Sequence, residues 1–285
     1  MNNILEVTKL NKNYPDFSLQ DITFALPDGC ITGFIGKNGA GKTTTLKSVL
    51  GLVPGISGSI KWFGMDLFAN EKKIKERIGI VLDSEGFYDE LTLTEMKNII
   101  ASAYKSWNES TYKRYLERFS LNPKQQINTL SKGMRMKYAL ALALSHEAEL
   151  LIMDEPTGGL DPLIRNQLLT ILKEFMDNGG RGVFFSTHIT SDLDKIADML
   201  IMIDDGHIVF QEEKDILSDR YRIVKGDTKD LCAGTEKLLI NIEQTPFGFT
   251  AITKYADEIK KIMPDSILER PSIEDIMLCN IKGGK

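Results

Sequence analysis

Cysteine is scarce in this chain of 285 residues, and its three cysteines, Cys30, Cys232 and Cys279, lie far apart. No two of them have the close spacing of a zinc site, and an odd number cannot form a complete set of disulfides. We therefore expect reduced thiols, and we exclude a small fold that depends on disulfides or zinc.

Long apolar runs are also missing. No stretch approaches the roughly 18 uncharged apolar residues of a membrane-spanning helix. The first residues, MNNILE, lack a basic region followed by an apolar one, which is the pattern of a secretory signal. We expect a chain that neither spans a membrane nor enters a secretory route.

Basic runs are absent as well, and the net charge is −5 with a pI near 5.4. The one lysine-rich stretch, residues 71–77, alternates with acids, as the solvated face of a helix does. This balance gives no long-range attraction to nucleic acid, so we expect no nucleic-acid partner.

A glycine-rich stretch, GKNGAGKTT at residues 36–44, follows an apolar run at 31–35 and precedes a helix-like segment. Glycines in this setting turn backbone N–H groups around the phosphates of a nucleotide, and the helix N-terminus adds partial positive charge. Lys42 supplies a full charge, and the Thr43 hydroxyl suits Mg²⁺. The residues expected at the nucleotide are Gly36, Asn38, Gly39, Ala40, Gly41, Lys42, Thr43 and Thr44.

Polar residues follow three apolar runs typical of buried strands. Asp83 follows residues 78–82, Asp154 and Glu155 follow 150–153, and His188 lies just beyond 182–185. Ligands of open α/β sheets bind at the carboxyl ends of the strands. We expect Asp154 to hold Mg²⁺ and Glu155 to take a proton from an attacking water, and Asp83 is a candidate for the metal or water neighbourhood.

Three further residues each have two interpretations from the pattern alone. Tyr14, in a turn between strand-like segments, could stack on a nucleobase or cover the sheet. Ser131 could simply cap the helix that follows it, although a capped helix N-terminus is also an anion site. One histidine at a strand end, His188, is by itself more often structural.

The spacing of apolar residues divides the chain. Residues 93–146 have helical periodicity, whereas the flanking segments alternate strand and helix patterns. Beyond residue 214 the sequence predicts a strand at 221–225, a helix at 253–263, and a capped helix after Ser272.

The order of these motifs resembles the ATP-binding subunit of ATP-binding-cassette (ABC) transporters over residues 1 to roughly 214. Residues 36–44 resemble the Walker A loop, 150–155 the Walker B strand with its catalytic glutamate, and 158–161 the D-loop. The resemblance implies that His188 is the switch histidine and that Tyr14 stacks on adenine.

The resemblance also implies the fold. It is an α/β P-loop NTPase with a RecA-like core, an antiparallel β layer and a helical subdomain at about 89–149. The expected domains are an ATPase domain at 1–214 and a small α/β accessory domain at 215–285.

Two positions depart from the family pattern. The signature, usually LSGGQ, reads LSKGM at residues 130–134. Ser131 and Gly133 remain to donate to a γ-phosphate, and Lys132 adds charge. Asp83 stands where the family's Q-loop has glutamine, and a carboxylate there can bind Mg²⁺ but repels phosphate oxygens. We expect Asp83→Gln to keep nucleotide binding and to alter turnover.

The mechanism implied by the resemblance is closure of two ATP-binding subunits, head to tail, on ATP and Mg²⁺. Ser131 and Gly133 of one subunit would meet the γ-phosphate held by Lys42 of the other. The chain would serve a separate transmembrane permease at the cytoplasmic face of the membrane, as a homodimer or with a paralogous subunit. Overall similarity favours export of a peptide, drug or lipid.

Two other functions remain open at this point. A soluble cassette ATPase acting on ribosomes or nucleic acid is one, although such relatives usually carry two cassettes or a long coiled-coil arm. A regulatory protein without turnover is the other, and the presence of both Glu155 and His188 argues against it.

Overall fold

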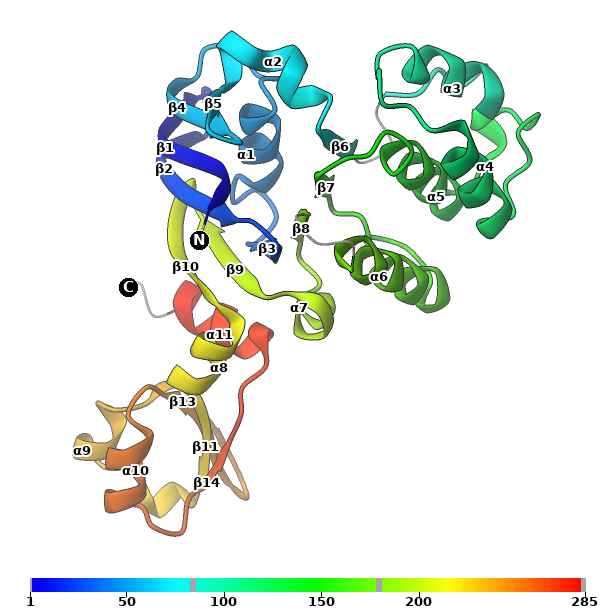
Figure 1. Cartoon of the computed structure of the whole chain (residues 1–285). Helices are drawn as coiled ribbons and strands as arrows, with labels where there is room; N and C mark the ends of the chain where they lie inside the picture. Colours follow the sequence, from blue (N-terminus) through cyan, green and yellow to red (C-terminus); the bar gives the residue numbers. More distant parts are fainter. Residues whose placement is uncertain (1, 83–85, 178–180, 283–285) are drawn as a thin grey trace.

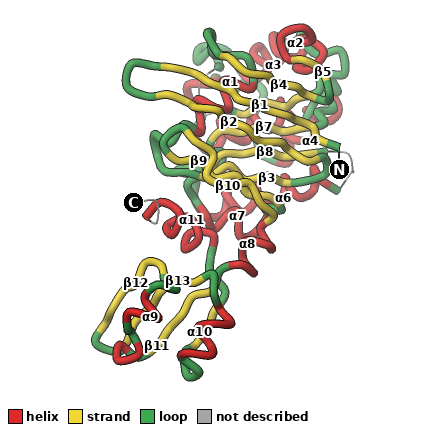
Figure 2. The backbone as a smooth tube through the Cα atoms, turned by 90° about the vertical axis from the view of Figure 1, so that its left-hand side faces the viewer, coloured by secondary structure: helices red, strands yellow, loops and turns green. Residues whose placement is uncertain are grey.

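The computed structural model describes residues 2–82, 86–177 and 181–282 (Figure 1). Three sheets organise these residues, and two of them build the larger part of the molecule (Figure 2). In these ranges no helix has the length and apolar character needed to cross a membrane.

The central sheet has six strands in the order β10-β9-β3-β8-β7-β6. All neighbouring pairs are parallel except β9 with β10, which is antiparallel. Every residue of β3, β7 and β8 is buried, which explains their continuous apolar runs. The strands are β3 (Ile31–Ile35), β6 (Ile78–Val81), β7 (Leu150–Asp154), β8 (Gly182–Thr187), β9 (Met199–Asp204) and β10 (His207–Glu213).

A second, antiparallel sheet covers one face and has the order β2-β1-β4-β5. Its strands are β1 (Asn3–Asn13), β2 (Ser18–Pro27), β4 (Ser57–Trp62) and β5 (Met65–Asp66). The rings of Phe24, Phe34 and Phe184, with centroids 5.5 to 6.1 Å apart, join the two sheets. Helix α1 (Lys42–Val49) contributes Leu46 to the same apolar cluster. The antiparallel layer thus braces the strand and helix on either side of the glycine-rich loop.

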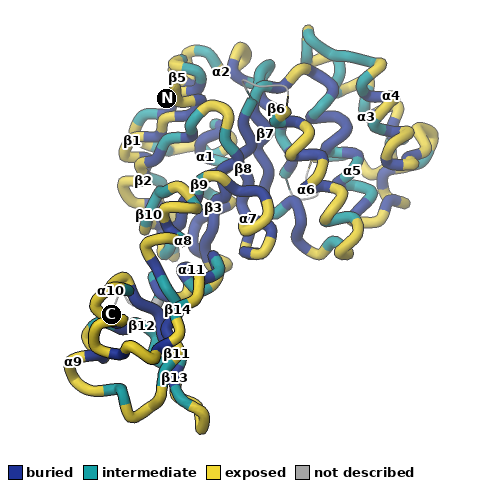
Figure 3. The backbone as a smooth tube through the Cα atoms, turned by 60° about the horizontal axis from the view of Figure 1, so that its bottom comes forward, coloured by how far each residue is buried: buried dark blue, intermediate teal, exposed yellow. Residues whose placement is uncertain are grey.

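Helices cover the other face of the central sheet. Helix α5 (Lys132–Ala143) packs beside β6, α6 (Pro162–Met176) beside β8 and α7 (Thr190–Ile196) beside β3, whereas α3 (Leu93–Ala101) and α4 (Glu109–Arg118) pack on α5. A short 3-10 turn lies at Ile127–Thr129. Helix α2 (Leu67–Lys75) lies on the side of the antiparallel layer, where its Leu67 and Ile74 join the apolar cluster of that layer. Figure 3 shows buried residues concentrated in the parallel strands, such as β7 and β8. Capping residues set the starts of α3, α5 and α6, which follow Thr92, Ser131 and Asp161.

The chain beyond β10 forms a third sheet, which extends away from the other two (Figure 1). Its strands, in the order β12-β13-β11-β14, are β11 (Arg222–Gly226), β12 (Ile240–Thr245), β13 (Gly248–Thr253) and β14 (Ile267–Glu269). Its helices are α8 (Lys214–Arg220), α9 (Ala233–Glu236), α10 (Ala256–Ile262) and α11 (Ile273–Lys282), and Thr228–Asp230 is a 3-10 turn.

The two faces of this third sheet pack against different partners. Val224 and Phe249 share an apolar cluster with Ile259 of α10, whereas Ile252 joins the large cluster that contains Ile276 of α11. The capping pattern after Ser272 is present, with its hydroxyl accepting from Asp275 N at 3.2 Å. Helix α10 begins at Ala256 and not at residue 253 as predicted, because β13 continues as far as Thr253.

Together these helices, strands and sheets give a mixed α/β fold of the P-loop NTPase class. It has a parallel central sheet, an antiparallel β layer, a group of helices and a small C-terminal α/β unit. The predicted fold class is confirmed by this architecture and by the structural similarity reported below.

Candidate functional site

The glycine-rich loop runs from the carboxyl end of β3 into α1. Gly39 and Gly41 have φ angles of 83° and 112°, in a region that side chains other than glycine rarely adopt. A Cβ atom on Gly36 would lie 2.3 Å from the carbonyl oxygen of Ile203. The loop therefore has its shape because glycine stands at these three positions.

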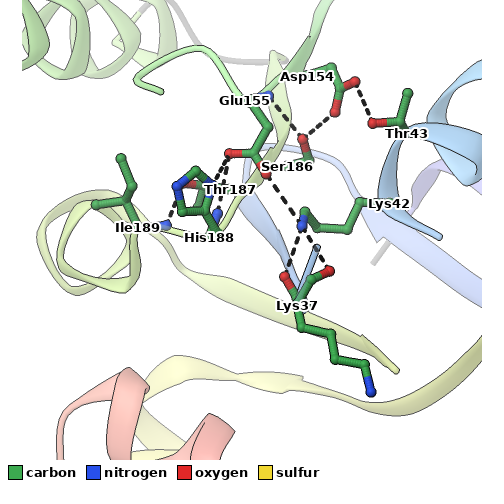
Figure 4. Close-up of polar contacts among 10 residues, drawn as sticks. Lys37, Lys42, Thr43, Asp154, Glu155, Ser186, Thr187, His188 and Ile189 are labelled. Atoms are coloured by element: carbon green, nitrogen blue, oxygen red, sulfur yellow. Dashed lines mark hydrogen bonds and ion pairs between the residues drawn. The ribbon is translucent and has the colours of Figure 1, made fainter. Parts of the chain in front are cut away.

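Lys42 is the first residue of α1, and only 6% of its surface is exposed. Its Nζ donates to Gly36 O at 2.8 Å and to Lys37 O at 3.3 Å, and lies 3.3 Å from Glu155 Oε1. Figure 4 shows the ammonium group at the centre of these oxygens. A positive charge is thus held where the loop meets the end of β7.

Thr43 and Asp154 approach each other although they are far apart in sequence. Thr43 Oγ1 donates to Asp154 Oδ2 at 2.8 Å, and Ser186 Oγ donates to Asp154 Oδ1 at 2.5 Å (Figure 4). β7 and β8 are parallel neighbours with Asp154 opposite Ser186, so both side chains reach the same edge. Ser186 was not among the predicted site residues, although its position near the carboxyl end of β8 could have indicated it.

Glu155 has a φ of 47°, an uncommon backbone conformation for a residue other than glycine. Its N–H donates to Ser186 Oγ at 2.9 Å, which helps to hold this conformation. The carboxylate is thereby divided between two partners, with Oε1 near Lys42 and Oε2 at 2.8 Å from Nδ1 of His188. Such strained residues concentrate at functional sites.

A cavity of about 780 Å³ opens over these groups. It is lined by Asp16, Phe17, Asn38, Gly39, Gly41, Lys42, Thr43, Thr44, Lys132, Glu155, Gly158, Gly159, His188 and Asp205. Most of the predicted loop residues and both Glu155 and His188 are therefore brought together. Asp16, Phe17 and Asp205 also line the cavity, and no pattern in the sequence had marked them as site residues.

Two predicted loop residues lie just outside the cavity lining. Gly36 contributes its carbonyl oxygen to Lys42, and Ala40 is buried with its own carbonyl accepting from Gly206 N at 3.0 Å. Both residues hold the loop in place through these hydrogen bonds to their backbone carbonyls.

Tyr14 is 44% exposed and is not one of the residues that line the cavity. The ammonium of Lys12 lies 4.9 Å from its ring centroid. The aromatic side chain that does line the cavity is Phe17, from the same turn, which is closed by a hydrogen bond of 2.8 Å from Tyr14 N to Phe17 O.

Ser131 and Gly133 are outside the cavity of their own chain. Ser131 caps α5 by accepting from Met134 N at 3.3 Å. Gly133 is buried, and a Cβ there would lie 2.8 Å from Ile164 Cδ1. Of the signature segment, only Lys132 lines the cavity.

The donor groups present fit a nucleotide phosphate with Mg²⁺. Thr43 and Asp154 offer a hydroxyl and a carboxylate oxygen side by side, and Mg²⁺ in nucleotide sites takes one or two protein ligands with the phosphates. Within the described ranges no group of three or more His, Cys, Asp or Glu side chains could form an all-protein metal site. Asp83, the third predicted metal ligand, lies outside the described residues.

Known proteins similar in sequence to this chain include ABC transporter proteins. A family model described as ABC transporter matches residues 19–158. The bacitracin transport ATP-binding protein BcrA of Bacillus licheniformis is 35% identical over 78% of this chain and 74% of its own length. The linearmycin resistance ATP-binding protein LnrL of Bacillus subtilis (strain 168) is 34% identical, over 79% and 73% of the two chains.

A solved structure described as the ATP-binding subunit of an ABC transporter superposes with a TM-score of 0.68. It is 32% identical and covers 75% of this chain and 91% of its own. The phosphate-binding loop, the acidic strand end and the histidine thus occur in a chain whose relatives are transport ATP-binding proteins. The chain belongs to the ABC transporter family and is an ATPase subunit of the type that energises a transporter.

Proposed function

We propose that the cavity binds ATP with Mg²⁺, and that Lys42, Glu155 and His188 carry out hydrolysis. The observation that carries this proposal is the meeting of these three side chains, with Glu155 Oε1 at 3.3 Å from Lys42 and Oε2 at 2.8 Å from His188 (Figure 4). Three separate segments of the sequence supply them, and all three residues line the cavity.

Each residue has a role that follows from its chemistry. Lys42 and the loop N–H groups bind the β- and γ-phosphates, and bound Mg²⁺ would neutralise charge on the phosphate oxygens beside Thr43 and Asp154. Glu155 orients a water molecule and accepts its proton. His188 contacts the γ-phosphate and, through its bond to Glu155, holds that carboxylate in place.

A second subunit completes the site in this proposal. Ser131 is exposed at the N-terminus of α5 and does not line the cavity of its own chain, so only another copy or a paralogue could bring it to the γ-phosphate. Charge-assisted hydrogen bonds to that phosphate would favour closure. Hydrolysis removes them and reopens the pair.

The names of the relatives support a proposal for the permease partner and for the class of substance transported. Their names refer to bacitracin transport, linearmycin resistance and lantibiotic transport. We infer that residues 1–214 form the ATPase domain of an exporter for a peptide, drug or lipid, acting at the cytoplasmic face of the membrane. Residues 215–285 form an accessory domain. The names do not favour the alternative of an ATPase that acts on ribosomes or nucleic acid.

The proposal is tested by tagging the chain in its native cell and solubilising membranes in mild detergent. A multi-spanning protein that co-purifies in fixed ratio, and that raises ATP turnover when reconstituted, is the expected result. Recovery of the chain without any membrane protein, or with ribosomes, would overturn the transport assignment.

A further inference from the structure

Asp192 is fully buried, with 0% of its side chain exposed, in the first turn of α7. Its Oδ1 accepts from Arg165 Nε of α6 at 2.5 Å, and the same guanidinium donates from Nη2 to Ser191 Oγ at 2.7 Å. Its second oxygen, Oδ2, has no hydrogen-bond partner among the described residues. A buried carboxylate therefore depends on one arginine of a neighbouring helix.

The two helices joined by this pair each begin at the nucleotide cavity. Helix α7 starts just after His188, and α6 starts just after the turn that contains Gly158 and Gly159, which line the cavity. Neither Arg165 nor Asp192 lines the cavity. The pair therefore lies outside the site and fixes the segments that enter it from two directions.

Other contacts restrict α7 on its remaining sides. A Cβ on Gly33 of β3 would lie 2.2 Å from Leu193 Cδ2, so the helix sits directly on the strand that leads to the phosphate loop. Asp194 Oδ1 accepts from Ile273 N of α11 at 3.3 Å. Helix α7 is joined to α6 by the buried bond from Arg165 to Asp192, and also by an exposed hydrogen bond of 3.2 Å from Lys195 Nζ to Asn166 Oδ1. The buried link is the one nearer the start of α7, where the chain leaves His188.

A buried ion pair is a poor way to gain stability, since the desolvation of two charges offsets much of their attraction and an apolar pair of similar volume often serves as well. The fork of an arginine does provide fixed geometry, because its planar N–H groups bond two partners in defined directions. Here the partners are Asp192 and Ser191, adjacent residues of α7.

We propose that Arg165 and Asp192 are positioning residues for ATP hydrolysis, which hold the His188 segment and the 158–161 turn in register. The inference rests on the proposed role of His188 and Glu155 in the site. Loss of the pair lets α7 shift relative to α6, so that His188 no longer holds Glu155 at the geometry that hydrolysis requires. We expect nucleotide binding to be retained, because neither Arg165 nor Asp192 lines the cavity.

The test compares Arg165→Met, Arg165→Lys and Asp192→Asn with the unmodified full chain and with Arg118→Met. Arg118 is the control, since it also forms an ion pair with α6, at 2.5 and 2.8 Å to Glu174, but that pair is exposed and neither residue lines the cavity. For each protein we would measure kcat, KM, the Kd for MgATP and the unfolding temperature.

We expect Arg165→Met to lower kcat about 10- to 100-fold, with KM and Kd within about threefold, because small misplacements of catalytic groups reduce the rate by such factors. Arg165→Lys should recover part of this loss. Asp192→Asn keeps the shape of the side chain and removes the buried charge. It should likewise lower kcat with little change in KM and Kd, and it provides the test if Arg165→Met fails to fold. Arg118→Met should change the unfolding temperature without changing kcat.

Either of two results would overturn the inference. The first is a kcat within about twofold of the Arg118→Met value for all three variants. The second is a Kd for MgATP that rises by the same factor as kcat falls. Glu155→Gln, measured in parallel, separates this failure from that of the proposed function. If Glu155→Gln still hydrolyses ATP normally, the assigned site is wrong. If it is inactive while the Arg165 variants are normal, only the positioning role fails.

Discussion

Glu155 and His188 are joined by a contact of 2.8 Å between Oε2 and Nδ1, and the backbone N–H of His188 adds a second bond of 3.3 Å to the same oxygen. The histidine thus fixes one carboxylate oxygen. The other oxygen, Oε1, faces Lys42 across 3.3 Å. If a bound phosphate replaced Glu155 as the ionic partner of Lys42, Oε1 would become free to accept a hydrogen bond from a water molecule, while Oε2 stayed bonded to His188.

Glu155→Gln should therefore abolish hydrolysis while keeping ATP bound. An amide cannot accept the proton, so we expect kcat to fall about 10²- to 10⁴-fold. With MgATP the variant should form a dimer in size-exclusion chromatography. Glu149→Gln is the matched control, since Glu149 pairs with Arg77 at 2.6 Å and does not line the cavity. A Glu155→Gln chain that stays monomeric with MgATP contradicts the closure model.

Thr43→Val should weaken nucleotide binding only when Mg²⁺ is present. The hydroxyl bonds Asp154 Oδ2 at 2.8 Å, so these two oxygens would be available together as ligands of Mg²⁺. We expect the Kd for MgATP to rise about tenfold, corresponding to about 1.4 kcal/mol, and the Kd measured in EDTA to stay the same.

The control for this change is Thr45→Val in the same helix. Thr45 is buried, and its hydroxyl has no hydrogen-bond partner among the described residues, so its replacement should leave both constants unchanged. An equal effect of Thr43→Val with and without Mg²⁺ would rule out a metal ligand at this position.

Much of this site could be predicted, because continuous apolar runs in the sequence indicate where buried strands end. The apolar runs before Asp154 and His188 indicate parallel strands, and the carboxyl ends of such strands share one edge. That rule predicts that Glu155 and His188 lie at the same edge of the sheet, whereas their contact depends on the pairing of β7 with β8. The conformation of the loop at residues 36–44 could also be predicted, because it depends on the glycines within the loop itself.

The remaining features depend on packing between distant segments, which periodicity does not encode. The bond between Arg165 and Asp192 requires the placement of α6 beside α7. The role of Ser186 depends on the register of β7 with β8. The boundary between β13 and α10 is set by strand pairing with β11, which overrides a helix-like local pattern.

Tyr14→Ala should weaken ATP binding about 5- to 150-fold, the effect of losing about 1 to 3 kcal/mol of stacking on a base. Tyr14 lies in the turn beside Asp16 and Phe17, which line the cavity. Tyr14→Phe should bind normally. Phe68→Ala, at an aromatic residue that is 63% exposed on α2, should have no effect.

The comparison variant is Phe17→Ala, with the Kd measured by a fluorescent ATP analogue. If Tyr14→Ala binds normally and Phe17→Ala does not, the base stacks on Phe17, and the role that the family resemblance implies for Tyr14 is wrong.

We predict that the buried side chain of His146 makes the stability of the protein depend on pH. Its side chain is 1% exposed, its ring is stacked on Tyr104 with centroids 3.8 Å apart, and its Nδ1 has no hydrogen-bond partner in the described part of the chain. Burial lowers the pKa of His146 to about 4. In the unfolded chain the same group titrates near pH 6.5.

Between these two values the unfolded state binds more protons than the folded state. Stability is therefore fully present above about pH 6.5 and falls as the pH is lowered toward 4. Between pH 7.5 and pH 5, this one group should reduce the free energy of unfolding by about 2 kcal/mol. His146→Phe, which keeps a ring against Tyr104, should lose that part of the pH dependence in urea unfolding. His207→Gln, at an exposed histidine, should keep it. If His146→Phe and the unmodified protein lose stability equally between the two pH values, the buried ring is not the source of the dependence.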